Sequence, residues 1–180
     1  MGSSACEPQK TKMLNRYTTG QFISDTKMTI GVDFAVHNAD LPENQGTATL
    51  QIWDFGGEER FRTMLPSFCQ GASGALLLFD LLDFRSIAEL DKLLYILRRN
   101  TRDIPIVLCG LNYGHIIDSE ELAFSPQSIK DFIIDNDIDG YLSVDNDTGL
   151  NVSEAFDKLT ELMIRSDSIH PNPSTIQVLD

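Results

Sequence analysis

The segment "GALLLFD" (Gly74–Asp80) is a continuous apolar run of strand length, and "IPIVLCG" (Ile104–Gly110) is a second one. Strands that are covered on both faces of a parallel sheet have this composition. Four leucines between the two runs recur at helical spacing: Leu90, Leu93, Leu94 and Leu97. Ser86 and Glu89 precede them as S-x-x-E, which predicts a capping box at the helix start. The stretch therefore predicts a βαβ unit of an α/β fold, with a mostly parallel sheet and helices on both faces.

Towards the N-terminus, the sequence predicts an antiparallel hairpin at one edge of this sheet. "TATLQIW" (47–53) alternates apolar and polar residues, and the turn residues "PENQG" separate it from a strand predicted over Ile30–His37. Further upstream, apolar spacing predicts a short helix over Lys10–Tyr17, and Gly20 is well placed to end it.

Towards the C-terminus, a second helix and strand repeat the pattern. Ser125 before Pro126 predicts a helix start, "GYLSV" (140–144) is a short strand, and Asn151 opens a helix with an apolar face. We expect one domain over residues 10–165, between an irregular N-terminus (1–9) and a polar tail (166–180) that contains two prolines and is expected to be flexible.

The composition excludes several classes of partner. A formal net charge of -13 and a pI near 4.5 argue against nucleic acid or an anionic membrane surface as the main partner. The three cysteines have no CxxC spacing, so neither a disulfide framework nor a zinc site is expected. The sequence has no membrane-spanning run or signal peptide, and "MGSSAC" has Cys6 where a myristoylation signal needs Ser or Thr. We expect a cytoplasmic protein without a stable membrane anchor.

Three segments resemble one family. "IWDFGGEERFR" (52–62) resembles switch II of Ras-superfamily small GTPases, with the double glycine of Arf-like and archaeal members. "TIGVDF" (29–34) resembles switch I of Rab proteins, and "TGLNVSEAF" (148–156) resembles the segment that leads into the last helix of Rab-type domains. The resemblance covers about Lys10 to Ile164 and implies a Ras-like G domain, which is a molecular switch that binds GTP and GDP with Mg²⁺.

The resemblance also implies a metal and phosphate site. Thr11, Thr29 and Asp54 correspond to the residues that hold Mg²⁺ directly or through water. Lys10 and the backbone N–H of Gly57 correspond to groups that contact the phosphates. Loss of the γ-phosphate releases both switch segments in this family. Taken singly, Thr29 is also an ordinary strand-initiating residue and Asp54 an ordinary turn or cap residue.

The phosphate loop departs from the family pattern. "SACEPQKT" (4–11) aligns with G-x-x-x-x-G-K-[ST] through its last two residues only, because both glycines are absent, Pro8 has no N–H and Glu7 adds a negative charge. The apolar strand that precedes this loop in the family is also missing, which predicts a gap between the strands at 47–53 and 74–80. Three alternatives follow: another segment fills this gap, the sheet closes without the missing strand, or the chain is a truncated version of a longer protein. Our interpretation favours truncation.

Guanine recognition is also altered. The family motif N-K-x-D aligns with Leu111–Gly114, so Asn112 is present in this segment but the carboxylate is absent. A register shifted by one residue places His115 at that position, which offers no pair of acceptors either. Ser143 and Val144 align with the S-A-K loop. The Val144 backbone N–H is expected to reach the base, because a backbone N–H does not depend on the side chain. Loss of the carboxylate predicts guanine binding that is weaker by about two to four powers of ten.

The catalytic position is changed as well. Glu58 stands where the family has the glutamine that orients the attacking water, and a carboxylate cannot donate a hydrogen bond there. One hypothesis is therefore a GTPase with slow or absent hydrolysis. A second is a nucleotide-free pseudo-GTPase that binds effectors or regulators, and a third is a fragment of an active GTPase. The expected partner surface consists of residues near the switches: Phe34, Trp53, Phe61 and Met64.

Overall fold

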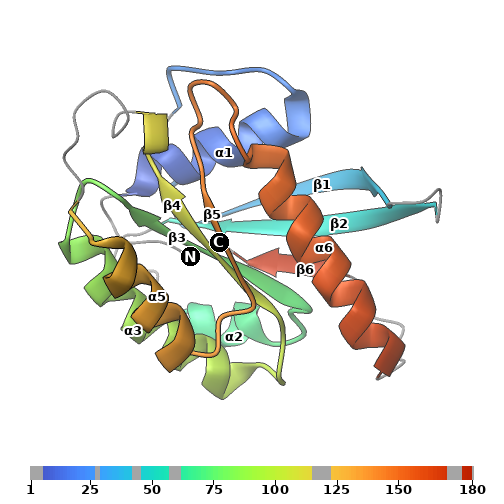
Figure 1. The fold of residues 1–180 in the computed structure, drawn as a ribbon. Helices are drawn as coiled ribbons and strands as arrows, with labels where there is room; N and C mark the ends of the chain where they lie inside the picture. Colours follow the sequence, from blue (N-terminus) through green and yellow to red (C-terminus); the bar gives the residue numbers. More distant parts are fainter. Residues whose placement is uncertain are drawn as a thin grey trace.

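The computed structural model describes residues 6–26, 29–41, 46–56, 62–114, 123–169 and 176–179. Its centre is a six-stranded sheet with helices on both faces (Figure 1). The helices are α1 (Glu7–Thr19), α2 (Leu65–Cys69), α3 (Arg85–Asn100), α5 (Pro126–Asp135) and α6 (Val152–Ile169). The strands are β1 (Val32–Asp40), β2 (Thr47–Phe55), β3 (Gly74–Asp80), β4 (Ile106–Leu111), β5 (Gly140–Ser143) and β6 (Ile176–Leu179). The predicted α/β class, parallel strands and edge hairpin are confirmed.

The strand order is β1-β2-β6-β3-β4-β5. β1 and β2 form the antiparallel hairpin, with Phe34 opposite Trp53, and every other pairing is parallel. The predicted alternation in β2 is confirmed because Leu50 and Ile52 are fully buried. The carboxyl ends of the parallel strands meet at one edge, where ligands bind in open α/β sheets.

Two apolar layers cover the sheet. On one face, α1 and α6 pack over inward residues of the strands, among them Leu76, Leu78 and Val107. On the other face, α2, α3 and α5 cover a second set that includes Leu77 and Leu108. Alternate residues of β3 thus face opposite layers, which explains its uninterrupted apolar run.

The predicted gap in the sheet is filled by β6. Leu50–Trp53 of β2 pair with Ile176–Leu179, and Gly74 and Ala75 of β3 pair with Val178 and Leu179 on the other side. Of the three alternatives for the gap, the structure therefore shows that another segment fills it. The expectation of a flexible tail over 166–180 differs from this arrangement, since α6 continues to Ile169 and residues 176–179 form a strand between two others.

The N-terminal boundary also differs from the expectation. α1 begins at Glu7, three residues before the predicted start, and Pro8 occupies its first turn. Proline suits this position because its fixed φ is helical and its missing N–H has no intrahelical acceptor there. Gly20 ends the helix in the left-handed conformation (φ 71°), as predicted.

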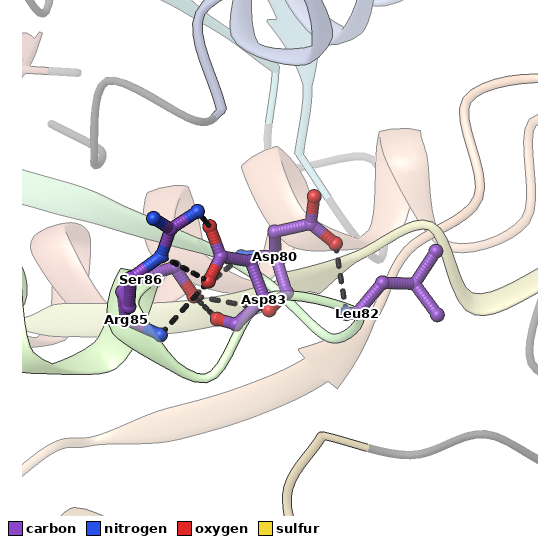
Figure 2. Close-up of polar contacts among 5 residues, drawn as sticks. All are labelled: Asp80, Leu82, Asp83, Arg85 and Ser86. Carbon is purple, nitrogen blue, oxygen red and sulfur yellow. Dashed lines mark hydrogen bonds and ion pairs between the residues drawn. The ribbon is translucent and has the colours of Figure 1, made fainter.

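The predicted capping box at Ser86 is wrong. α3 begins at Arg85, so Ser86 lies inside the first turn, where its hydroxyl donates to the carbonyl oxygens of Asp80 and Asp83 (Figure 2). Arg85 and Asp83 face each other in the same turn, and hydrogen bonds from Arg85 hold the pKa of the Asp83 carboxyl below its ordinary value. The side chain of Ser86 thus closes the β3–α3 turn instead of capping a helix. By contrast, the predicted cap at Ser125 is confirmed, because its side chain accepts from the Ser128 N–H.

All three cysteine thiols are buried and unbridged, so we expect the native chain to resist thiol reagents. Burial raises the pKa of the Cys69 thiol to about 11, which keeps the reactive thiolate scarce at neutral pH. Titration with an aromatic disulfide reagent should detect three thiols in urea and almost none in the native state. Fast reaction of one thiol in the native state would contradict the packing around it.

No helix among the described residues is long and apolar enough to cross a membrane.

Candidate functional site

Three predicted metal ligands meet in one cluster. The Thr11 hydroxyl comes from α1, Thr29 from the segment before β1, and Asp54 from the end of β2. Thr11 Oγ1 lies 2.9 Å from Thr29 Oγ1, and the two hydroxyls lie 3.0 and 3.1 Å from Asp54 Oδ2. We call these three residues the hydroxyl–carboxylate cluster. The segments that carry them are separated by up to 43 positions in the chain, so only the fold brings them together.

Lys10 lies on the inner side of this cluster. Its ammonium donates to the Phe55 carbonyl oxygen and lies 3.9 Å from Asp54 Oδ1. Lys10 is 1% exposed and Asp54 is fully buried. Asp54 Oδ1 has no hydrogen-bond partner among the described residues, so Lys10 supplies its counter-charge without a direct hydrogen bond. The lysine predicted to contact phosphate is thus bound to the protein itself.

Local backbone contacts place Thr29 against Asp54. The Gly56 N–H donates to the Gly31 carbonyl oxygen at 2.8 Å, which ties the segment before β1 to the end of β2. A Cβ atom at Gly56 would lie 2.3 Å from the Thr29 carbonyl oxygen, so this position tolerates only glycine. Gly31 itself has a φ of 87°.

The donor set of the cluster suits Mg²⁺. Neighbouring ligands of an octahedral Mg²⁺ at about 2.0–2.1 Å lie about 2.9 Å apart, close to the oxygen spacing in the cluster. Two hydroxyl protons also serve three oxygen–oxygen contacts, so one of the three contacts has no hydrogen bond. Asp54 Oδ1 is buried without a hydrogen-bond partner among the described residues, so this carboxylate has acceptor capacity that a cation could use. The residues present therefore fit a magnesium ion, with Thr11, Thr29 and Asp54 as the groups that would hold it.

A cavity of about 480 Å³ opens beside two members of the cluster. Thr11 and Thr29 line it from one side, and Asn15, Asp25 and Asp33 add polar atoms. Among the described residues, neither Lys10 nor any residue after Asp33 lines this cavity. Its described lining therefore flanks the proposed metal position and includes no residue of the predicted base site.

The predicted base-binding residues lie together at the ends of β4 and β5. Gly110 pairs with Ser143, and Asn112 follows β4 with a φ of 64°. The Val144 N–H, expected to reach the base, instead donates to the Gly110 carbonyl oxygen at 2.7 Å. The Ser143 hydroxyl lies 3.0 Å from the Tyr141 hydroxyl. The expectation for the Val144 amide is therefore not met in this conformation, because strand pairing continues one residue beyond β5.

Asn146 and Arg16, which the sequence did not indicate as site residues, connect the loop after β5 to α1, the helix that carries Thr11. The Asn146 amide donates to the carbonyl oxygen of Gln9, at 2.8 Å, and to its side-chain oxygen, at 2.9 Å. The Arg16 guanidinium donates to three successive carbonyl oxygens, those of residues 146, 147 and 148. These bonds hold the loop after β5 against α1. The Asp and Thr of "DNDTG" (145–149) are typical of such a hydrogen-bonded turn, but nothing in the sequence predicts its contact with Arg16.

The expected partner surface is only partly described. Phe34 and Trp53 lie side by side on the hairpin, with ring centroids 4.9 Å apart, and Trp53 also contacts Phe68. Phe34 and Met64 are exposed. Trp53 Nε1 is buried without a hydrogen-bond partner among the described residues. The predicted Gly57, Glu58 and Phe61 lie outside the described residues, so their roles stay predictions.

Comparison with known proteins assigns a family to this arrangement. The model of the Ras family matches residues 1–165. Ras-related protein Rab-11C of Dictyostelium discoideum is 32% identical over 83% of the chain, and human Ras-related protein Rab-9B is 30% identical over 83%. Ras-related protein RABA6b of Arabidopsis thaliana is 38% identical over 63% of the chain. The matched regions span 65% of Rab-11C, 74% of Rab-9B and 48% of RABA6b.

Proposed function

Because the chain belongs to the Ras family, we propose that it is a guanine-nucleotide switch domain with a degenerate site and slow or absent GTP hydrolysis. The observation that supports this most is the hydroxyl–carboxylate cluster. Its three oxygens come from α1, the segment before β1 and the end of β2, and their spacing suits Mg²⁺.

Magnesium would neutralise the phosphate charge, which is the chemistry that it supplies when bound. The residues of this chain would do the rest. Thr11 and Asp54 would hold the ion from rigid elements, while Thr29 lies on a segment outside helix and strand. If Thr29 binds the ion, it would therefore link the position of the segment before β1 to the presence of the ion.

Three features of the chain weaken nucleotide binding and turnover. Glu7–Lys10 belong to a helix that contains Pro8. This segment therefore offers a phosphate fewer backbone N–H groups than the glycine-rich loop of the family pattern does. Lys10 must leave the Phe55 carbonyl oxygen before it can contact phosphate. Glu58, at the water-orienting position, would repel the developing negative charge. We therefore propose weak binding and a chemical step slower than that of an intact site.

A second candidate is a nucleotide-free binding module for effector or regulator proteins. It is favoured by the way in which Lys10 and the Val144 N–H are both bonded to backbone carbonyl oxygens of the protein. The exposed Phe34 and Met64, with the partly buried Trp53 beside Phe34, form the surface proposed for such partners. The cluster would then be a purely structural hydrogen-bonded group.

The deciding experiment is a titration of the purified chain with fluorescent GTP, GDP and ATP analogues, with and without Mg²⁺. We expect saturable, Mg²⁺-dependent binding that prefers guanine, with a Kd between about 10 μM and 1 mM. Thr29→Ala should weaken the Mg²⁺-dependent part by about tenfold, which is the loss of one ligand. Thr26→Ala is the matched control, because Thr26 lines the same cavity but lies outside the cluster.

The possible results separate the two candidates. Equal affinity with and without Mg²⁺, or an unchanged affinity in Thr29→Ala, would remove the role proposed for the cluster. No binding of any nucleotide up to about 1 mM would reject the switch and leave the nucleotide-free module.

A further inference from the structure

The C-terminal strand β6 pairs over a short length. Its backbone pairs with four residues of β2 but with only two of β3, whereas β3 and β4 pair over six residues. Beyond the end of β6, side chains from the start of α1 contact the flanking strands. Lys10 donates to the Phe55 carbonyl oxygen, and the Cys6 thiol lies 3.9 Å from the Leu78 carbonyl oxygen. Among the described residues, a strand therefore fills only part of the length between β2 and β3.

The backbone pairs of β6 all join it to segments that are far away in the chain. α6 ends at Ile169, β6 begins at Ile176, and residues 170–175 connect them. α6 packs on the sheet against a separate apolar layer that includes Leu76 and Leu78. Because these contacts of α6 do not involve β6, the strand can leave the sheet while α6 stays in place.

Departure of β6 exposes two strand edges at once, one on β2 and one on β3. Exposed strand edges present unpaired N–H and C=O groups, which readily accept another strand. The structure shows which strand fits this position, because residues 176–179 (IQVL) lie there in a defined parallel register. A second copy of the chain carries the same strand and would make the same pairs.

We propose that the position between β2 and β3 is an interaction site for a second copy of this chain, which donates its residues 176–179 in place of β6. Reciprocal exchange gives a symmetric dimer in which each copy completes the sheet of the other. The pairs are the same in monomer and dimer, so the balance depends on the effective concentration that the connector 170–175 gives to the chain's own strand. For a short connector this concentration is on the order of 1 mM, and the dimer dissociation constant is expected in the same range. The inference does not depend on nucleotide binding.

Changing the length of the connector tests the exchange without altering any paired residue. Deletion of residues 171–173 shortens the connector, so the chain's own strand reaches its position less easily and the strand of the second copy is favoured. We expect the dimer dissociation constant, measured by sedimentation equilibrium, to fall by at least about tenfold. Insertion of Gly-Ser-Gly after Asn172 is the matched control, and it should leave the constant within about threefold of the native value.

Paramagnetic broadening locates the exchanged strand when the connector has its native length. A copy with a nitroxide on Asp180→Cys and a ¹⁵N-labelled copy are mixed in urea and refolded together at about 1 mM. The three native cysteines are buried, so the nitroxide attaches selectively to the new thiol of the folded chain. We expect broadening of ¹⁵N amides around Trp53 and Ala75, which pair with Leu179. A nitroxide on Asp135→Cys, an exposed position of α5, is the control and should leave these amides sharp.

The results separate strand exchange from other kinds of association. A dimer with the same dissociation constant for all three connectors, or amides broadened equally by both nitroxides, means association through another surface and rejects the proposal. No dimer of the shortened chain and no broadening around Trp53 up to about 1 mM means that β6 stays in its own copy, which also rejects it. If circular dichroism shows that the shortened chain does not fold, the nitroxide experiment decides alone.

Discussion

Replacement of Lys10 by methionine is expected to lower the free energy of unfolding by roughly 3–5 kcal/mol. Lys10 and Asp54 are both almost completely buried, and the ammonium is 3.9 Å from a carboxylate oxygen that has no hydrogen bond among the described residues. Methionine conserves the volume but leaves a buried charge without its counter-charge, and it also removes the donor to the Phe55 carbonyl oxygen. Urea unfolding followed by circular dichroism measures the change.

Two further variants show whether the loss comes from the charge pair. The double variant Lys10→Met with Asp54→Asn removes both charges, so part of the lost stability should return, and the double-mutant cycle gives the coupling. Lys12→Met, two residues further along the same helix, should change stability by less than about 1 kcal/mol, because Lys12 is only half-buried and its ammonium lies 5.8 Å from the centre of the Phe22 ring. A loss below 1 kcal/mol in Lys10→Met would contradict the buried pair.

Replacement of Val178 by proline is expected to destabilise the domain by roughly 3 kcal/mol or more. β6 lies between β2 and β3, and Val178 pairs with Ile52 on one side and Gly74 on the other. Proline removes a backbone donor from a central strand, where it is almost never found. The expected result is a lower midpoint in urea together with faster hydrogen exchange of amides in Leu50–Trp53 and Gly74–Ala75.

Val178→Ala is the control for this prediction, since it keeps the backbone N–H and carbonyl of β6. It should be less destabilising than proline and should leave the amides of β2 and β3 protected. If proline leaves stability and exchange unchanged, residues 176–179 do not occupy the position between β2 and β3 in solution.

Local patterns were sufficient to predict most elements of the fold. The apolar runs at 74–80 and 104–110 predicted parallel strands, since strands buried on both faces have no polar alternation. Gly20 and Ser125 predicted a helix end and a helix start, because their conformation and side-chain bonding involve only a few neighbouring residues. Ser86 shows where such reasoning fails: the same S-x-x-E pattern was used to close a turn with Asp80, six residues earlier.

For the candidate site, too, the sequence predicted some features and missed others. The sequence identified the residues of the hydroxyl–carboxylate cluster because their types and order resemble a family pattern. It did not show that Lys10 faces Phe55, that the Val144 N–H pairs with Gly110, or that Asp145 lies against Gly114. Each of these is a contact between distant segments. In the unfolded chain a donor has several possible acceptors of similar energy, and the fold determines which of them lies near it.

The sequence by itself thus determined the α/β class, the edge hairpin, and the identity of the residues that form the cluster. Only the tertiary structure decided which segment lies between β2 and β3 and where the charged side chains of Lys10, Asp54 and Asp145 are buried. The physical reason is the range of the interactions. Propensity, capping and hydrophobic periodicity act within a few residues, whereas strand pairing and charge burial depend on contacts between segments that are far apart in the chain.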